Sequence, residues 1–120
     1  MRRDIDLLRV LILEMEENRA PLCSPAGAPS RSEEEERVDF HLRLLSAEAF
    51  LEETVREGGI VFRMTDKGHE LAVTLQSENI WDRTKAAAAV APVDVSISAL
   101  MDIALGLIRQ ELAKHGLGPR

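Results

Sequence analysis

The stretch SEEEERVDFHLRLLSAEAFLEETVREGGIVFRM, residues 32–64, decides the fold of this chain of 120 residues. Its first half begins with Ser32 and has Glu35 three positions later, the form of a helix capping box. Apolar residues then recur at helical spacing. The pattern predicts a helix over about 33–49.

The second half of the stretch predicts a β-hairpin. Two short segments with strand-like composition, 50–55 and 60–64, lie on either side of Gly58 and Gly59. A pair of glycines suits a tight reversal of the backbone, because glycine adopts positive φ angles without a steric cost. We therefore expect a helix followed directly by a hairpin.

Further helices are predicted on both sides of this stretch. Apolar residues at helical spacing, and Thr65 or Asp66 as a cap, predict helices at about 4–17, 67–75, 81–90 and 96–115. Residues 20–31 contain three prolines, which remove amide donors and disfavour helix. This segment is predicted to be a loop.

The order helix, loop, helix, hairpin, helix is that of a winged-helix domain with a helical extension. We predict a mainly α chain with a small β-hairpin: a winged-helix-like domain with a C-terminal helical extension. A length of 120 residues fits one domain, with the winged-helix-like part at 1–90 and the C-terminal helix at 91–120.

The last predicted helix is apolar on nearly every face. Two alternatives stay open for it: a central core helix, or the interface of a homodimer. The residues that would form a subunit interface are Ile97, Leu100, Met101, Ile103, Leu107 and Ile108.

Four blocks of the sequence resemble a known family. They are MRRDIDLLRVLILEMEE, HLRLLSAEAFLE, MTDKGHELAV and ENIWDRTK, and together they are similar to the family called domain of unknown function 2513. The positions that match its pattern are Arg3, Asp4, Asp6, His41, Leu42, Leu45, Thr65, Gly68, His69, Glu70, Trp81 and Lys85.

The chain departs from the family pattern at some positions. Asp66 stands where the family usually has Trp, Ala49 where it usually has Gly, and Leu71 with Ala72 where it has Phe-Leu. The proline-rich segment replaces one that could form a middle helix. The resemblance implies a winged-helix-like fold and an origin in bacteria, phages or prophages, and it implies no activity.

The sequence favours a protein that is not an enzyme. It has no Walker, GxGxxG or GxSxG motif and one cysteine, Cys23, in a loop-like segment. His41, His69 and His115 lack metal-ligand spacing, so no metal and no cofactor are expected. We expect His41 and His69 to make structural hydrogen bonds where helices meet, to backbone or to a carboxylate such as Asp4 or Asp6.

Charge is concentrated in the stretch that decides the fold. Residues 33–57 hold nine acidic and three basic residues, a net charge of −6, which equals the net charge of the whole chain. In a winged helix this region would contact DNA, and an acidic surface there repels phosphates.

We therefore predict a regulatory protein that binds a protein partner, such as a basic host protein, by imitating nucleic acid or as an anti-defence inhibitor. The predicted binding residues are Glu33, Glu34, Glu35, Glu36, Asp39, Glu52, Glu53 and Glu57. The alternative is a winged helix-turn-helix transcriptional regulator that binds DNA through basic residues on another face, namely Arg2, Arg3, Arg9, Arg63 and Lys67.

The N-terminal segment has no signal-peptide core, because Asp4, Asp6 and Arg9 interrupt its apolar residues. The apolar runs are also too short to span a membrane. We expect a cytoplasmic protein without a membrane partner.

Overall fold

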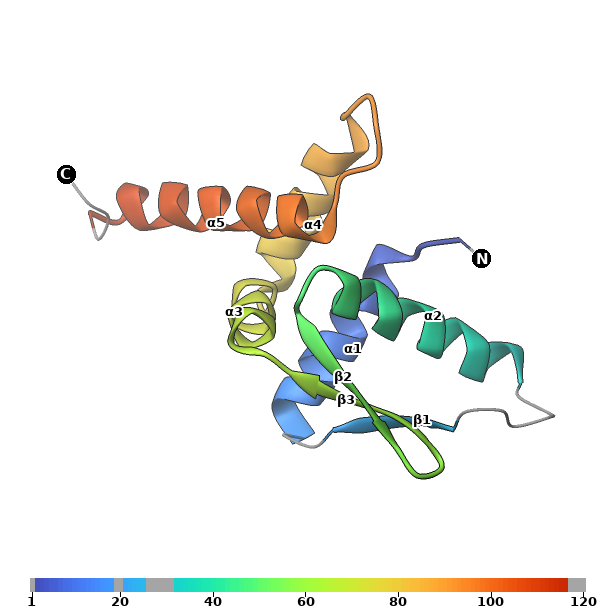
Figure 1. Ribbon diagram of the computed structural model, residues 1–120. Coiled ribbons are helices and arrows are strands. Elements are labelled where there is room, and N and C mark those ends of the chain that lie inside the picture. Colours follow the sequence, from blue (N-terminus) through green and yellow to red (C-terminus); the bar gives the residue numbers. More distant parts are fainter. Residues whose placement is uncertain (1, 19–20, 26–31, 117–120) are drawn as a thin grey trace. The chain divides into compact units, whose positions relative to one another are not determined.

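The computed structural model describes residues 2–18, 21–25 and 32–116 and divides the chain into two compact units (Figure 1). Unit 1 is Met1–Ala72 and unit 2 is Val73–Arg120, so the boundary between them falls inside a helix. The division of the chain at residue 90 stays a prediction.

Unit 1 holds two long helices, a small sheet and the first part of a third helix. Its elements are α1 (Ile5–Asn18), β1 (Leu22–Pro25), α2 (Glu33–Ala47), β2 (Leu51–Arg56), β3 (Gly59–Met64) and the start of α3 (Asp66–Thr74). The predicted helices and the predicted hairpin are confirmed. A mainly helical chain with an antiparallel hairpin after α2 is consistent with a winged-helix-like fold.

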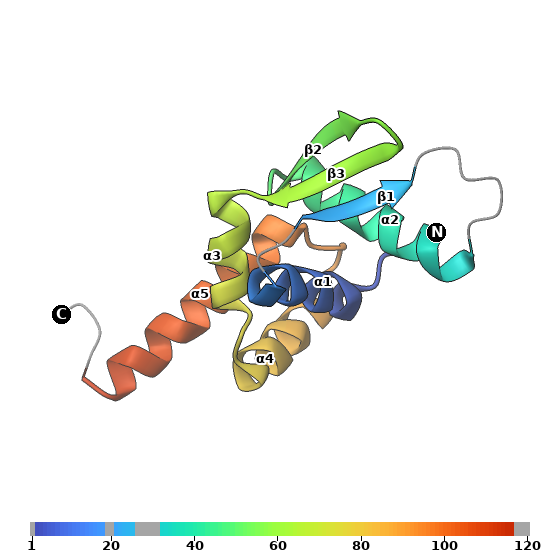
Figure 2. The ribbon, with the colours of Figure 1, turned by 90° about the horizontal axis from the view of Figure 1, so that it is seen from below.

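The three strands form one antiparallel sheet with β3 in the middle, in the order β1-β3-β2 (Figure 2). Arg56 is opposite Gly59 at the end of the hairpin, and Gly58 in the turn has a φ of 89°. Residues with a side chain rarely adopt that backbone angle, which explains the glycine at this position.

The strand β1 corrects the prediction of a loop over residues 20–31. Residues 22–25 pair with β3, from Leu22 opposite Phe62 to Pro25 opposite Gly59. Because β1 is an edge strand, Pro25 does not have to donate a hydrogen bond to a strand on its outer side. Residues 19–20 and 26–31 of the predicted loop lie outside the described part of the chain.

The core of unit 1 joins the helices to the hairpin. Ile12 of α1, Leu45 of α2, Phe50 before β2 and Phe62 of β3 are each 0% exposed. Burial of one such side chain is worth about 1.5–3 kcal/mol, so these contacts outweigh any single polar contact on the surface. α1 and β2 both pack against α2.

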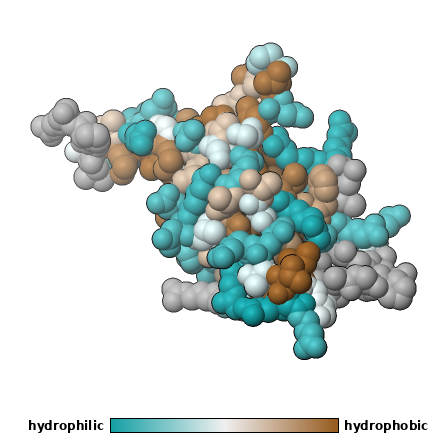
Figure 3. All heavy atoms as spheres, viewed as in Figure 1, coloured by the Kyte–Doolittle hydropathy of each residue, from teal (hydrophilic) through white to brown (hydrophobic). Residues whose placement is uncertain are grey.

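Unit 2 contains α4 (Glu78–Ala89) and α5 (Ile97–Lys114), which pack against each other. Each helix begins at a serine whose hydroxyl accepts an amide hydrogen bond: Ser77 from Ile80, and Ser96 from Ala99. On the face seen in Figure 3, hydrophobic residues gather along α5.

An ion pair links the two helices of unit 2. Arg83 Nη1 of α4 donates to Glu111 Oε1 of α5 over 2.8 Å, and Lys114 Nζ lies 3.4 Å from the same oxygen. The hydrogen bond from Arg83, with the nearby charge of Lys114, lowers the pKa of Glu111 below the ordinary carboxyl value. Glu111 is therefore ionised at neutral pH and holds α5 to α4.

Among the residues that the structure describes, no helix is both long and apolar enough to cross a membrane.

Candidate functional site

The first turn of α2 presents glutamates to solvent. Glu33, Glu34 and Glu36 are exposed, and Glu34 Oε2 lies 3.8 Å from Arg37 Nη1. Acidic residues in a first helical turn also interact favourably with the helix dipole, by about 0.3–1 kcal/mol each. These three carboxylates therefore support the helix and remain accessible to a partner.

Glu35 takes part in the cap of the same helix. The amide of Glu35 donates to Ser32 Oγ (3.1 Å), and Glu35 Oε1 accepts from the Ser32 amide (3.4 Å) and from Ser32 Oγ (3.1 Å). The predicted capping box is confirmed. Since its carboxylate closes this box, Glu35 is less available than its neighbours for a partner.

The hairpin adds a second group of exposed acids. Glu52 and Glu53 lie on the edge strand β2, and Glu57 lies in the turn that follows it. Glu52 is opposite Arg63 of β3, which is exposed as well. Because Glu52 and Glu53 are successive residues of the edge strand β2, their side chains lie on opposite faces of the sheet.

Asp39 corrects the predicted list of binding residues. Its side chain is only 12% exposed, and Oδ2 accepts a hydrogen bond from Arg43 Nε over 2.9 Å. Asp39 lies beside the apolar stripe of α2, so the fold buries it. The exposed acids of the predicted list apart from the capping residue Glu35 are called the acidic surface residues below: Glu33, Glu34, Glu36, Glu52, Glu53 and Glu57.

The basic residues proposed for DNA differ in their surroundings. Arg2 and Arg63 are exposed, whereas Arg3 and Arg9 are half-buried. Lys67 is exposed, but its Nζ donates to the Glu48 carbonyl (2.9 Å) and lies 4.5 Å from the centre of the Phe50 ring. Binding of a phosphate by Lys67 would therefore compete with contacts that hold α3 to the end of α2.

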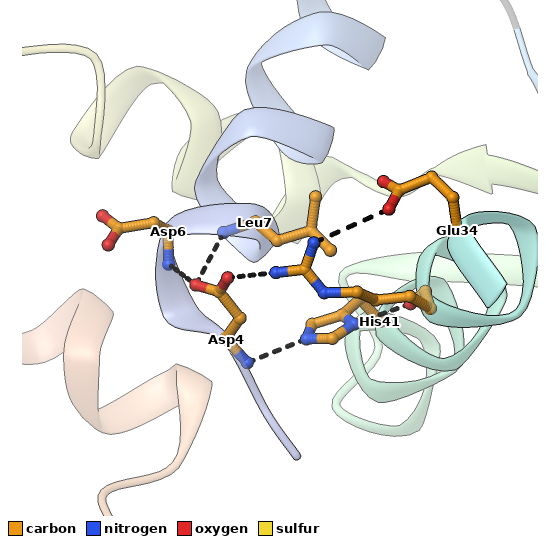
Figure 4. A network of polar contacts seen from close by, with 6 residues as sticks. Asp4, Asp6, Leu7, Glu34 and His41 are labelled. Atoms are coloured by element: carbon orange, nitrogen blue, oxygen red, sulfur yellow. Dashed lines mark hydrogen bonds and ion pairs between the residues drawn. The ribbon is translucent and has the colours of Figure 1, made fainter. Parts of the chain in front are cut away.

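A polar network joins the start of α1 to α2 (Figure 4). Asp4 caps α1, because its Oδ1 accepts from the amides of Asp6 (3.0 Å) and Leu7 (3.3 Å). Its Oδ2 is paired with the guanidinium of Arg37. The Asp4 side chain thus accepts hydrogen bonds from two amides at the start of α1 and attaches α1 to α2 through its ion pair with Arg37.

His41 lies in the same network and is fully buried. Its Nε2 accepts from the Asp4 amide over 2.8 Å, so this nitrogen carries no hydrogen. Its Nδ1 lies 2.7 Å from the Arg37 carbonyl oxygen, which can only accept, so Nδ1 carries the hydrogen. Both ring nitrogens serve the fold, and His41 makes the structural hydrogen bond that its sequence position predicted.

His69 makes the other predicted structural contact. Its Nδ1 pairs with Glu16 Oε2 of α1, which connects α3 to α1 within unit 1. Within the described ranges 2–18, 21–25 and 32–116, no group of three or more His, Cys, Asp or Glu residues could hold a metal ion.

The end of α2 and the start of α3 meet at a compact joint. Ala49 has a φ of 67°, and hydrogen bonds from the amides of Ala49 and Phe50 to the carbonyls of Ser46 and Leu45 close the helix in a Schellman motif. Thr65 Oγ1 donates to the Ala49 carbonyl (2.6 Å) and accepts from the Gly68 amide (3.1 Å).

Gly68 is required at this joint because the backbone passes too close for any side chain. A Cβ atom at this position would lie 2.1 Å from the Phe50 carbonyl oxygen. Five of the positions that carried the family resemblance in the sequence therefore lie at contacts that hold unit 1 together: Asp4, His41, Thr65, Gly68 and His69.

The predicted dimer interface on α5 stays a prediction. Ile97, Leu100 and Met101 are 8% exposed or less within the single chain. Ile103, Leu107 and Ile108 are half-buried. The buried apolar side chains of α5 thus pack within the chain itself.

Two features of the site were missed in the sequence. The Asp4–Arg37 pair joins residues 33 positions apart, and no local pattern indicates it. The Asp39–Arg43 pair could have been noticed, because Arg43 follows at i+4, the spacing of a helical ion pair, whereas the burial of Asp39 depends on packing.

Comparison with known proteins agrees with the resemblance seen in the sequence. The model of the family described as "Hypothetical protein (DUF2513)" matches residues 2–93. The chain is 26% identical to an uncharacterized protein of Haemophilus influenzae, over 94% of this chain and the full length of that relative. No solved structure matches the chain.

Proposed function

The chain belongs to the family described as "Hypothetical protein (DUF2513)", and we propose that it is a non-catalytic regulatory protein that binds a basic protein partner. The binding surface consists of the acidic surface residues on α2 and on the β2–β3 hairpin. The observation that carries this proposal is the exposure of these six glutamates in the region that holds the entire net charge.

The position of these glutamates argues against contact with DNA at the same place. In a winged helix, the helix before the hairpin enters the major groove and the hairpin lies against phosphate. Here that helix is α2, and its first turn is acidic at every position from Glu33 to Glu36. Association with nucleic acid depends on neutralising phosphates, so this surface favours a cationic partner.

The arrangement of the histidines supports a function without catalysis. A general acid or base needs a nitrogen that can reach a substrate and exchange a proton with it. Both nitrogens of the buried His41 are engaged with backbone groups, and His69 is paired with Glu16. These groups are committed to the fold of unit 1.

We further propose that the partner is a host protein that normally binds nucleic acid, and that the chain acts in the cytoplasm of a bacterium as a phage or prophage product. Rows of carboxylates on a helix and on a strand can occupy a surface built for phosphates. The chain would then inhibit its partner by competing with nucleic acid.

Electrophoresis of labelled duplex DNA separates this function from that of a transcriptional regulator. At moderate salt we expect no shift of duplex DNA by the protein. The regulator would be favoured instead if the wild-type protein shifts DNA and the double substitution Arg2→Glu with Arg3→Glu abolishes the shift. The double substitution Arg56→Glu with Arg109→Glu, at two other exposed positions, makes the same change in net charge and is the control for that change.

A further inference from the structure

One stripe of α5 faces solvent. Asp102 and Arg109 are exposed, and Leu112 is 40% exposed. At 3.6 residues per turn these positions fall on one side of the helix with Leu105 and Gly106. In this stripe, called the outer stripe, Asp102, Gly106 and Arg109 lie away from the buried residues of α5, which are Ile97, Leu100, Met101 and Ala104, and the leucines lie at its edge on the side of Met101.

The charges on the outer stripe are complementary to those of an identical stripe in the opposite direction. Asp102 and Arg109 are seven residues, or about two helical turns, apart and equally far from the midpoint between Leu105 and Gly106. An antiparallel copy of α5 centred on that midpoint brings each Asp102 next to Arg109 of the second copy. A parallel copy would place like charges together.

We propose that two copies of this chain associate through the outer stripes of α5, antiparallel about a two-fold axis that passes between Leu105 and Gly106. An interface with this symmetry uses the same patch twice, so one complementary pair of charges gives two ion pairs. The proposal is independent of the acidic surface residues, because it concerns unit 2 alone.

The side chains near the axis fit this arrangement. Leu105 lies at the same level as Gly106 of the second copy, so a large residue is next to a small one near the axis. A Cβ added at Gly106 would meet nothing within 4 Å, so packing within the chain gives no reason for a glycine there. Glycine weakens a helix interior compared with alanine, whereas close approach of a second helix requires a small residue.

Exposed ion pairs contribute little by themselves, so apolar contacts of Leu105 and Leu112 supply most of the attraction and the charges select the direction. We therefore expect a reversible dimer. Its dissociation constant is measured by sedimentation of the full-length protein over a range of concentrations, and the wild-type protein is expected to change from monomer to dimer.

Charge exchange tests the direction of pairing. Asp102→Arg places two like-charge contacts in the dimer, and so does Arg109→Asp, so each variant should weaken association by about tenfold or more. The double variant with both substitutions restores both pairs and should dimerise again. An equimolar mixture of the two single variants should form a heterodimer, because one chain then has a basic residue at both positions and the other has an acidic residue at both.

Three controls make the outcome decisive. Asp94→Arg changes an exposed charge outside the outer stripe and should leave dimerisation unchanged. Gly106→Gln fills the space at the axis and should weaken the dimer by about tenfold or more, and circular dichroism confirms the helix content of each variant. The proposal is overturned if the wild-type protein is a monomer at every concentration, if the single exchanges leave the dimer intact, or if the double exchange and the mixture both fail to restore it.

Discussion

Ala49 adopts a backbone conformation that glycine tolerates better. Its φ of 67° closes α2, and the sequence resemblance implies glycine at this position in the family. For any residue with a Cβ, the left-handed conformation costs roughly 1 kcal/mol. Alanine at this position, in place of the family's glycine, should therefore lower the free energy of unfolding while the backbone keeps the same conformation.

Replacement of Ala49 by Gly should raise the free energy of unfolding by about 0.5–1 kcal/mol, because glycine relieves the strain at the helix end. Chemical denaturation measures the change. Ala47→Gly is the matched control: Ala47 is exposed in the last turn of α2, in helical conformation, so glycine there should lower the stability by about 0.5–1 kcal/mol. Equal effects of the two substitutions would contradict this account of Ala49.

His41 is a buried polar residue whose loss should damage unit 1 strongly. Replacement by Ala removes a fully buried ring, leaves the Asp4 amide without its acceptor, and removes the side-chain hydrogen bond to the Arg37 carbonyl. We expect a loss of about 2–4 kcal/mol in the free energy of unfolding. His115→Ala, at an exposed position, should change it by less than about 0.5 kcal/mol. Unchanged stability of the His41 variant would show that the network is dispensable.

At the scale of the elements, local signals in the sequence predicted most of the fold. Ser32 with Glu35, and the glycines of the hairpin, act within a few residues of their own position, so their effect can be read without the rest of the chain. The strand β1 was missed because it depends on pairing with β3, which lies far along the chain. Its neighbouring and terminal prolines, Pro21 and Pro25, also obscured the strand pattern.

The candidate site was predicted less completely than the elements, because exposure depends on packing. The glutamates at 33, 34, 36, 52, 53 and 57 are exposed as the sequence suggested, whereas Asp39 is buried. On α5, the apolar residues expected at a subunit interface include three that the chain itself covers. Periodicity identified the apolar faces of the helices, and only the packing shows which of them are occupied.

The ion pair between α4 and α5 gives unit 2 a predictable dependence on pH. Because Arg83 and Lys114 lower the pKa of Glu111, this contact stabilises the fold above the ordinary carboxyl pKa, and the contribution is lost as the pH falls through the lowered pKa. NMR titration of Glu111 should show its pKa rising in Arg83→Gln. A rise is also expected in Lys114→Gln, since the charge of Lys114 and its hydrogen bond lower the same pKa. An unchanged pKa in the Arg83 variant would contradict the pairing.

At the scale of the whole molecule, the fold is typical of a protein that binds DNA, whereas the charge of residues 33–57 favours a basic partner. A hairpin after a helix is the arrangement of a DNA-binding winged helix, yet residues 33–57 carry a net charge of −6. Helix stability accounts for the acids in the first turn of α2, but not for Glu52, Glu53 and Glu57 in the hairpin. The proposed partner with a basic surface would interact with both groups of acids.

Quantitative affinity capture from a bacterial lysate, with nucleic acid digested beforehand, tests this claim most directly. Three baits are compared: the wild-type protein, a variant with Glu52, Glu53 and Glu57 replaced by Gln, and a matched control with Glu14, Glu17 and Glu78 replaced by Gln. The control loses the same charge from exposed positions outside the acidic surface residues. We predict that the wild-type and control baits recover the same basic protein, that the hairpin variant does not, and that recovery falls as salt is raised. Equal recovery by all three baits, or no specific recovery by the wild-type protein, would contradict the account.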